Sequence, residues 1–164
     1  MRLLMVARRF PPDVRSGTET VFEQLYEHAR RRHEVRLVAG YRRARELIPP
    51  EAVAVDLRGA SPVEAWGRIA AAALKEERAF RPDVVLGNSI ETHVMKSPLV
   101  VIVHDLNFGL TQRSWKSRVR EVFYRNRCRK VTSVVAVSHA ARQSLDAKGI
   151  RPRRIEVIHN GVDL

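Results

Sequence analysis

Three residues suited to binding a sugar follow a buried-type run of the sequence, LVVIV at 99–103. They are His104, Asp105 and Asn107. A histidine can donate to or accept from a sugar hydroxyl, and an aspartate can orient that histidine or accept from hydroxyls itself. Three polar side chains at the end of a buried strand favour a ligand site. The alternative is a structural histidine beside an aspartate that caps a turn.

A second candidate lies in loop 8–17, RRFPPDVRSG, which joins an early apolar run to a helical pattern. Gly17 would let the backbone approach a ligand, and the N–H groups of the following helix attract a phosphate or a sugar hydroxyl. Asp13 and Ser16 belong to the same loop. The alternative is that Gly17 only eases a tight turn. A dinucleotide fingerprint needs G-x-G-x-x-G, so the single glycine disfavours NAD.

Asn88 and Ser89 follow another apolar run and give a weaker signal of the same kind. His104 with His93 and Glu91 could suggest zinc. No pair has the H-x-x-x-H spacing, however, so we expect no metal. The single cysteine, Cys128, excludes an internal disulfide. Neither Cys128 nor Ser138 has a paired base in the sequence, so nucleophilic catalysis is not supported.

Apolar runs alternate with helical spacing along the whole chain. We expect strands at 3–7, 35–39, 52–57, 83–86, 99–103, 133–137 and 155–158, and helices at 17–31, 61–80, 113–130 and 138–148. Ser16 with Glu19 and Ser61 with Glu64 have the spacing of capping boxes, and Ser138 can cap the helix at 138–148. The inward face of the second helix is expected to be Trp66, Ile69, Ala70, Ala73 and Leu74.

This alternation predicts an α/β fold: a Rossmann-like, doubly wound parallel sheet of about seven strands with helices on both faces. In such folds ligands collect beyond the carboxyl ends of the strands. That rule selects the loops at 8–17, 87–93, 104–112 and 138–139, which contain the polar candidates named above.

The composition fits one basic globular domain. The chain has 164 residues, and 30 Lys and Arg against 18 Asp and Glu give a net charge of +12. Its apolar runs are too short to span a bilayer, and its start is a poor signal peptide, so we expect a cytoplasmic protein. The basic segment 113–130 could bind anionic lipid at the inner membrane face, or be a solvated outer helix. No DNA or RNA motif is present.

Six segments carry a family resemblance. FPP…SGTE, RHEVRLVAG, RPDVV, VVIVHDL, VVAVSHAARQSL and IEVIHNGVDL follow one another over nearly the whole chain. Together they resemble the N-terminal domain of a GT-B fold glycosyltransferase of family 4. The chain departs from the family pattern at Ser16-Gly17, where two glycines are common, and at Arg32, where a glycine commonly stands.

The resemblance implies two Rossmann-like domains that face each other across a cleft. The N-terminal domain chiefly binds the acceptor (a glycan, lipid or small molecule), and the C-terminal domain holds a UDP- or GDP-sugar donor. Transfer with retention of configuration, no metal and no tightly bound cofactor are implied as well. Gly17 matches the family's glycine-rich loop, and His104 matches the catalytic-site histidine that contacts the transferred sugar. Asn160, Gly161 and Asp163 match the hinge.

On this resemblance we expect residues 1–159 to form the acceptor-side domain and 160–164 to begin the hinge. The donor domain is expected to lie outside these 164 residues, which leaves the chain inactive alone. Apolar surface without its partner domain should favour self-association. Two alternatives stay open: a standalone Rossmann-like nucleotide-binding domain, and a basic module that binds membrane or nucleic acid.

Overall fold

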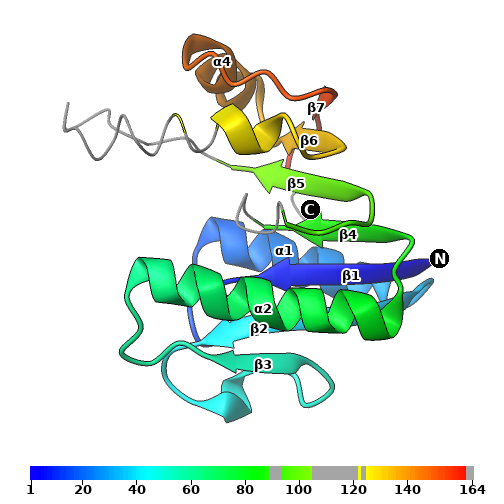
Figure 1. The fold of residues 1–164 in the computed structure, drawn as a ribbon, viewed down its shortest axis with the longest axis vertical. Helices are drawn as coiled ribbons and strands as arrows, with labels where there is room; N and C mark the ends of the chain where they lie inside the picture. The colour runs from blue at the N-terminus through cyan, green and yellow to red at the C-terminus, as the bar shows by residue number, and fades with distance from the viewer. Residues whose placement is uncertain (89–93, 105–121, 123–124, 162–164) are drawn as a thin grey trace. The chain divides into compact units, whose positions relative to one another are not determined.

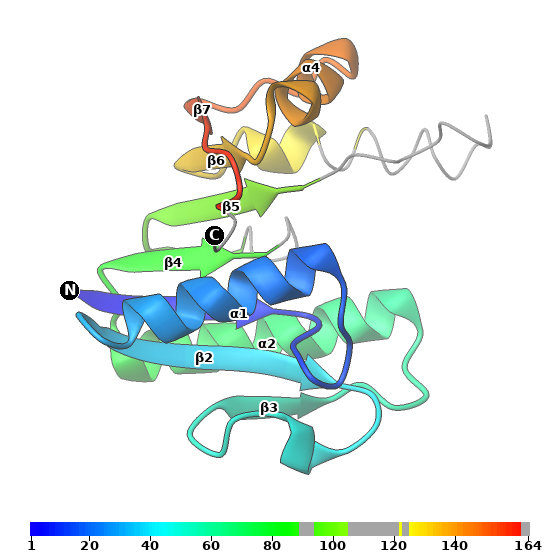
Figure 2. The same ribbon diagram turned by 180° about the vertical axis from the view of Figure 1, so that it is seen from behind.

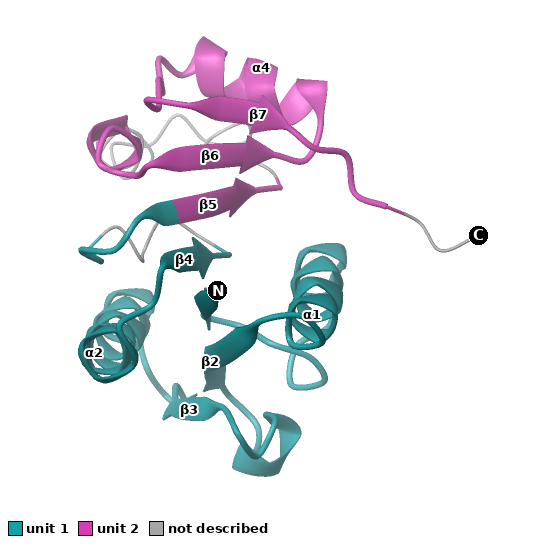
Figure 3. Cartoon of the chain, turned by 90° about the vertical axis from the view of Figure 1, so that its right-hand side faces the viewer, with its two compact units in different colours: residues 1–99 teal, residues 100–164 magenta. Residues whose placement is uncertain are grey.

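A computed structural model describes residues 1–88, 94–104, 122 and 125–161. The backbone divides into two compact units, Met1–Leu99 and Val100–Leu164, which Figure 3 colours separately. The predicted domain boundary between residues 159 and 160 does not coincide with this division and stays a prediction.

The first unit contains four parallel strands in the order β3-β2-β1-β4. Their bounds are β1 (Arg2–Ala7), β2 (Glu34–Tyr41), β3 (Val53–Asp56) and β4 (Val84–Gly87). Strand β1 lies between β2 and β4, and its residues from Leu3 to Ala7 are all buried. That burial explains its unbroken apolar sequence, since a central parallel strand is covered on both faces.

Two helices cover opposite faces of these strands. Helix α1 (Gly17–Ala29) lies on one face and α2 (Pro62–Phe80) on the other, as a comparison of Figures 1 and 2 shows. A short 3-10 turn, η1 (Arg45–Leu47), follows β2. The first unit therefore has the doubly wound arrangement that the sequence predicts.

Of the two predicted capping boxes, one forms. Ser61 accepts from the Glu64 backbone N–H at 3.3 Å, and Glu64 accepts from the Ser61 N–H at 2.7 Å. At the start of α1, the Ser16 side chain caps no backbone N–H; its hydroxyl donates to the Glu19 carboxylate instead. Ser16 and Glu19 therefore interact, but the predicted capping box at the start of α1 is wrong.

The buried face of α2 differs from the predicted one by about one position. The buried residues are Ala65, Ile69, Ala73, Glu77 and Phe80, whereas Trp66, Ala70 and Leu74 are half-buried. The cause is polar: one carboxylate oxygen of the buried Glu77 accepts from the backbone N–H groups of Lys96 at 2.8 Å and Ser97 at 2.7 Å. These bonds turn the Glu77 side of the helix inward.

The second unit contains three parallel strands in the order β5-β6-β7. Their bounds are β5 (Leu99–Val103), β6 (Ser133–Ala136) and β7 (Ile155–Val157). Helix α4 (His139–Ala147) packs on β6 and β7. Ser138 caps it by accepting from the Ala141 N–H at 3.0 Å, as predicted, and Gly149, with φ +62°, follows its end.

The described residues form seven parallel strands in the two units together, alternating with helices, which confirms the Rossmann-like α/β prediction. Most of the predicted helix 113–130 lies outside the described residues; within it, residues 125–128 are helical. Val122, which belongs to the same predicted helix, is 45% exposed. Among the helices of the described part of the chain, none is long and apolar enough to cross a membrane.

Candidate functional site

In the first unit, three candidate segments meet at the carboxyl ends of adjacent strands. Loop 8–16 leaves β1, residues 42–44 leave β2, and Asn88 follows β4. In-register pairing such as Ala7↔Ala39 brings the first two together, and the Asn88 N–H donates to the Val6 carbonyl at 3.0 Å. This is the edge at which ligands bind in open α/β sheets.

Asp13 holds loop 8–16 in place. Its side chain is 2% exposed, and its two oxygens accept from the backbone N–H groups of Arg42 at 2.8 Å and Arg43 at 2.7 Å. A buried carboxylate needs such donors, because an unpaired charge is costly to bury. Through these two bonds Asp13 joins the exits of β1 and β2. Its expected place among the acceptor-binding residues stays a prediction.

The same two exits also touch at Gly40, on β2. A Cβ atom there would lie 2.5 Å from the Arg8 carbonyl oxygen and 2.4 Å from Leu57 Cδ1. Both distances are well below van der Waals contact. The path of loop 8–16 therefore depends on the absence of a side chain at residue 40.

Gly17 differs from Gly40 in this respect. It is exposed, and a Cβ atom added to it would meet nothing within 4 Å. Packing inside the protein therefore gives no reason for a glycine at this position, the first residue of α1. The exposed Ser16 lies beside it, with its hydroxyl on Glu19.

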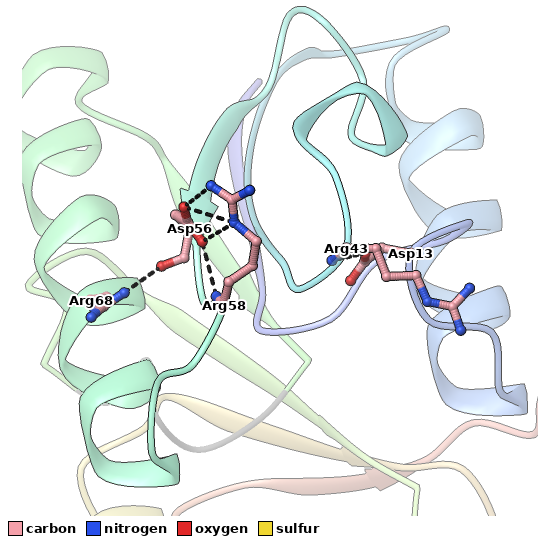
Figure 4. A network of polar contacts seen from close by, with 5 residues as sticks. All are labelled: Asp13, Arg43, Asp56, Arg58 and Arg68. Atoms are coloured by element: carbon pink, nitrogen blue, oxygen red, sulfur yellow. Dashed lines mark hydrogen bonds and ion pairs between the residues drawn. The ribbon is translucent and has the colours of Figure 1, made fainter.

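The arginines at the strand ends fall into two kinds (Figure 4). Arg58, after β3, pairs with Asp56 at 2.6 Å, and its hydrogen bonds hold the pKa of that carboxyl far below its usual value. Arg68 donates to the Asp56 carbonyl at 2.9 Å. Arg42 and Arg43 use their backbone N–H groups on Asp13, and both residues are exposed.

Asn88 contains an unsatisfied polar atom. Its side-chain oxygen Oδ1 is buried, and no donor within the described residues reaches it. Buried carbonyl oxygens normally accept at least one hydrogen bond. This acceptor lies directly after β4, at the edge just described, where a ligand hydroxyl would satisfy it.

The second unit gathers histidines at the carboxyl ends of its own strands. His104 follows β5 and is half-buried. His139 begins α4 after β6, and His159 comes two residues after β7; their ring centroids are 5.5 Å apart and both are exposed. Sequence reasoning missed this pair, although both residues follow strands that it placed in one parallel sheet.

Of the remaining candidates, Ser89, Asp105, Asn107 and Asp163 lie outside the described residues. Asn160 and Gly161, the predicted hinge residues, are exposed and belong to no helix or strand. Among the described residues, no group of three or more His, Cys, Asp or Glu side chains could hold a metal ion.

The fold is shared with solved structures of longer chains. Anabaena Alr3699/HepE in complex with UDP and glucose is 18% identical, with a TM-score of 0.68 over 99% of this chain and 45% of its own. The same protein with UDP alone gives a TM-score of 0.67 at 17% identity, over 99% and 45% of the two chains.

UDP-GlcNAc 2-epimerase from Methanocaldococcus jannaschii is also similar, at 15% identity and a TM-score of 0.64, over 98% of this chain and 46% of its own. The chain thus spans less than half the length of each of these structures. No curated protein matches it by sequence.

These likenesses define the class: one Rossmann-like half of a GT-B fold. The particular family comes from the sequence, since the family model described as Glycosyltransferase Family 4 matches residues 15–164. The chain belongs to glycosyltransferase family 4, as its resemblance predicted.

Proposed function

We propose that this chain is the acceptor-side domain of a retaining glycosyltransferase. The full enzyme would transfer a sugar from a nucleotide-sugar donor to a glycan, lipid or small-molecule acceptor. The observation that carries this assignment is the family match over residues 15–164. The polar strand ends of the first unit support it, because they offer hydrogen-bonding groups at the edge where α/β sheets bind ligands.

The residues take two kinds of role. His104 contacts the transferred sugar and is the catalytic residue, and the acceptor is bound by Ser16, Gly17, Asn88, Ser89, Asp105 and Asn107. The buried, unsatisfied Oδ1 of Asn88 supports a hydroxyl-bearing ligand. Asp13 is a positioning residue, because its carboxylate is occupied by two backbone N–H groups.

The donor is held by a second domain that follows a hinge at Asn160, Gly161 and Asp163. UDP and glucose bound to Anabaena HepE support a UDP-sugar, with a GDP-sugar as the alternative. We place the enzyme in the cytoplasm. There, segment 113–130 would contact an anionic membrane surface, and the isolated chain would self-associate.

The first test uses the chain alone. The 164 residues are mixed with UDP-glucose or GDP-mannose and a panel of glycoside acceptors, and sugar transfer is followed by mass spectrometry. We expect no turnover but saturable acceptor binding, with NMR shift changes at Asn88 and Gly17. Turnover by the chain alone, or the absence of any acceptor binding, would contradict this part of the assignment.

The second test joins residues 1–164 through the hinge to a nucleotide-sugar-binding domain of family 4. Transfer should retain the anomeric configuration, as read by NMR of the product. His104→Ala should lower kcat at least tenfold, and Asn88→Ala should mainly raise the acceptor KM. Epimerisation of UDP-GlcNAc without transfer would instead favour the activity that the name of the Methanocaldococcus neighbour states.

A further inference from the structure

Four exposed arginines lie in the segments that leave β1 and β2 at their carboxyl ends: Arg9, Arg15, Arg42 and Arg43, called here the arginine rim. We propose that the arginine rim binds a phosphate group, so that the acceptor is a phosphorylated molecule. That the bound molecule is the acceptor rests on the proposed function. The anion site itself rests on the residues of the rim.

The backbone brings the rim together. Arg9 and Arg15 belong to the loop that leaves β1, and Arg42 and Arg43 are the first two residues after β2. The two strands are parallel neighbours, so these segments emerge at the same edge. Because the short side chain of Asp13 bonds to the N–H groups of both Arg42 and Arg43, the two segments are in direct contact.

The guanidinium groups of the rim are available for a ligand. Elsewhere in the first unit arginines pair with carboxylates: Arg2 with Glu34, Arg36 with Glu76, and Arg58 with Asp56. No such pair involves a rim arginine within the part of the chain that the structure describes. Asp13 does not neutralise them by side-chain pairing, since its oxygens face backbone N–H groups. In Figure 4 the Arg43 side chain projects past Asp13, away from the Asp56–Arg58 pair.

The chemistry of the rim selects phosphate. A guanidinium presents a planar fork of donors that matches two oxygens of a phosphate, and it stays charged at every physiological pH. The first turn of α1 adds backbone N–H groups beside Arg15, at the exposed Gly17. The buried Asn88 oxygen can accept only from a donor such as a hydroxyl. A ligand with a phosphate and hydroxyl groups suits both features.

The test measures anion binding by the full 164-residue chain with isothermal titration calorimetry. The soluble probes are inorganic phosphate and glycerol 3-phosphate; the lipid probe is phosphatidylcholine vesicles that contain phosphatidic acid, against vesicles of phosphatidylcholine alone. The variant is Arg42→Gln with Arg43→Gln. The matched control is Lys75→Gln with Arg78→Gln on the exposed side of α2, which also removes two positive charges but leaves the arginine rim intact.

We expect the rim variant to weaken phosphate binding by about tenfold or more, the loss of roughly one charge-assisted hydrogen bond. The control should change it less than about twofold, since distant surface charges act only through a screened field. Thermal melting should be unchanged in the rim variant, because the backbone N–H groups that bind Asp13 remain.

Loss of glycerol phosphate binding in the rim variant alone supports a soluble phosphorylated acceptor. Loss seen only with phosphatidic acid vesicles supports a phosphate carried by a lipid. Equal losses in both variants, or no binding to any probe, would overturn the phosphate site. If the joined enzyme transfers sugar to a neutral acceptor, and the Arg42→Gln/Arg43→Gln variant does so at the same rate, the proposed function stands and the phosphate site is wrong. If phosphate binding depends on the arginine rim but the joined enzyme transfers no sugar, the phosphate site stands and the proposed function is wrong.

Discussion

The backbone N–H of Arg43 donates to Oδ1 of Asp13 at 2.7 Å, while the Arg43 side chain projects away from that bond. One residue thus contributes its backbone to the loop scaffold and its charge to the rim. Asp13 completes the scaffold with its other oxygen on Arg42. The position of the rim and its chemistry can therefore be changed separately.

Asp13→Asn should destabilise the chain by about 1–3 kcal/mol, the cost of an unsatisfied buried donor. An amide has one carbonyl oxygen, whereas Asp13 uses both oxygens, so one backbone N–H would face an NH₂ group. Glu77→Gln should cost less, because Glu77 receives both of its N–H donors on the single oxygen Oε1. Urea unfolding followed by circular dichroism measures both; equal losses would contradict this account.

Gly40→Ala should destabilise the first unit by about 1–3 kcal/mol, the usual cost of overpacking. The added methyl group would meet the Arg8 carbonyl and the buried Leu57. Gly67→Ala is the control, since its methyl group would meet nothing and α2 would gain up to about 1 kcal/mol of helix propensity. The two midpoints of urea unfolding should move in opposite directions.

Gly17→Ala should leave stability nearly unchanged and weaken ligand binding. The protein leaves open space where the methyl group would lie, so any loss must come from the bound molecule. Acceptor titrations of the wild-type chain and the variant measure this. An unfolding midpoint lowered as far as in the Gly40→Ala variant would show that the glycine serves the fold.

Cys128, the single cysteine, should react slowly with Ellman's reagent at pH 8. Its side chain is fully buried, and burial raises the pKa of the thiol from 9.0 to about 11. Because the folded pKa is the higher one, this thiol's contribution to stability is complete below pH 9 and is lost as the pH rises through 11. Labelling rates and urea midpoints at pH 8 and 10.5 test both statements; immediate labelling of the folded chain would refute them.

Ser61→Ala should cost about 1 kcal/mol, the usual value for a lost N-cap. Ser61 accepts from the Glu64 N–H, so its removal leaves a helix-end donor without a partner. Ser16→Ala should cost less, because Ser16 caps no backbone N–H of α1. Thermal denaturation of the two variants compares them, and a larger loss for Ser16→Ala would be inconsistent with the observed geometry.

The sequence predicts those features that depend on local spacing. The capping of α2 by Ser61 and of α4 by Ser138 involves residues three apart, and both appear in the structure. The seven strands follow from apolar runs in the same way. Ser16 and Glu19 have the same spacing as a capping box, yet a side-chain hydrogen bond replaces the cap, and spacing alone does not separate the two geometries.

Features that depend on partners far along the chain escape prediction. The donors to Asp13 come from residues 29 and 30 positions later, so no local pattern indicates that this carboxylate is buried and paired. The donors to Glu77 are 19 and 20 positions away, and they turn α2 from its expected face. In both cases a buried carboxylate accepts from backbone N–H groups. Every residue except proline has such a group, so the residue types at the donor positions do not reveal the bond.

That anchoring mode has an evolutionary consequence. Every residue except proline offers a backbone N–H, so positions 42 and 43 can accept almost any side chain while Asp13 keeps the loop in place. Mutations there can accumulate without passing through unstable intermediates. Descendants of this domain can thus exchange a charged ligand for a neutral one on an unaltered frame, provided that residue 13 stays an aspartate.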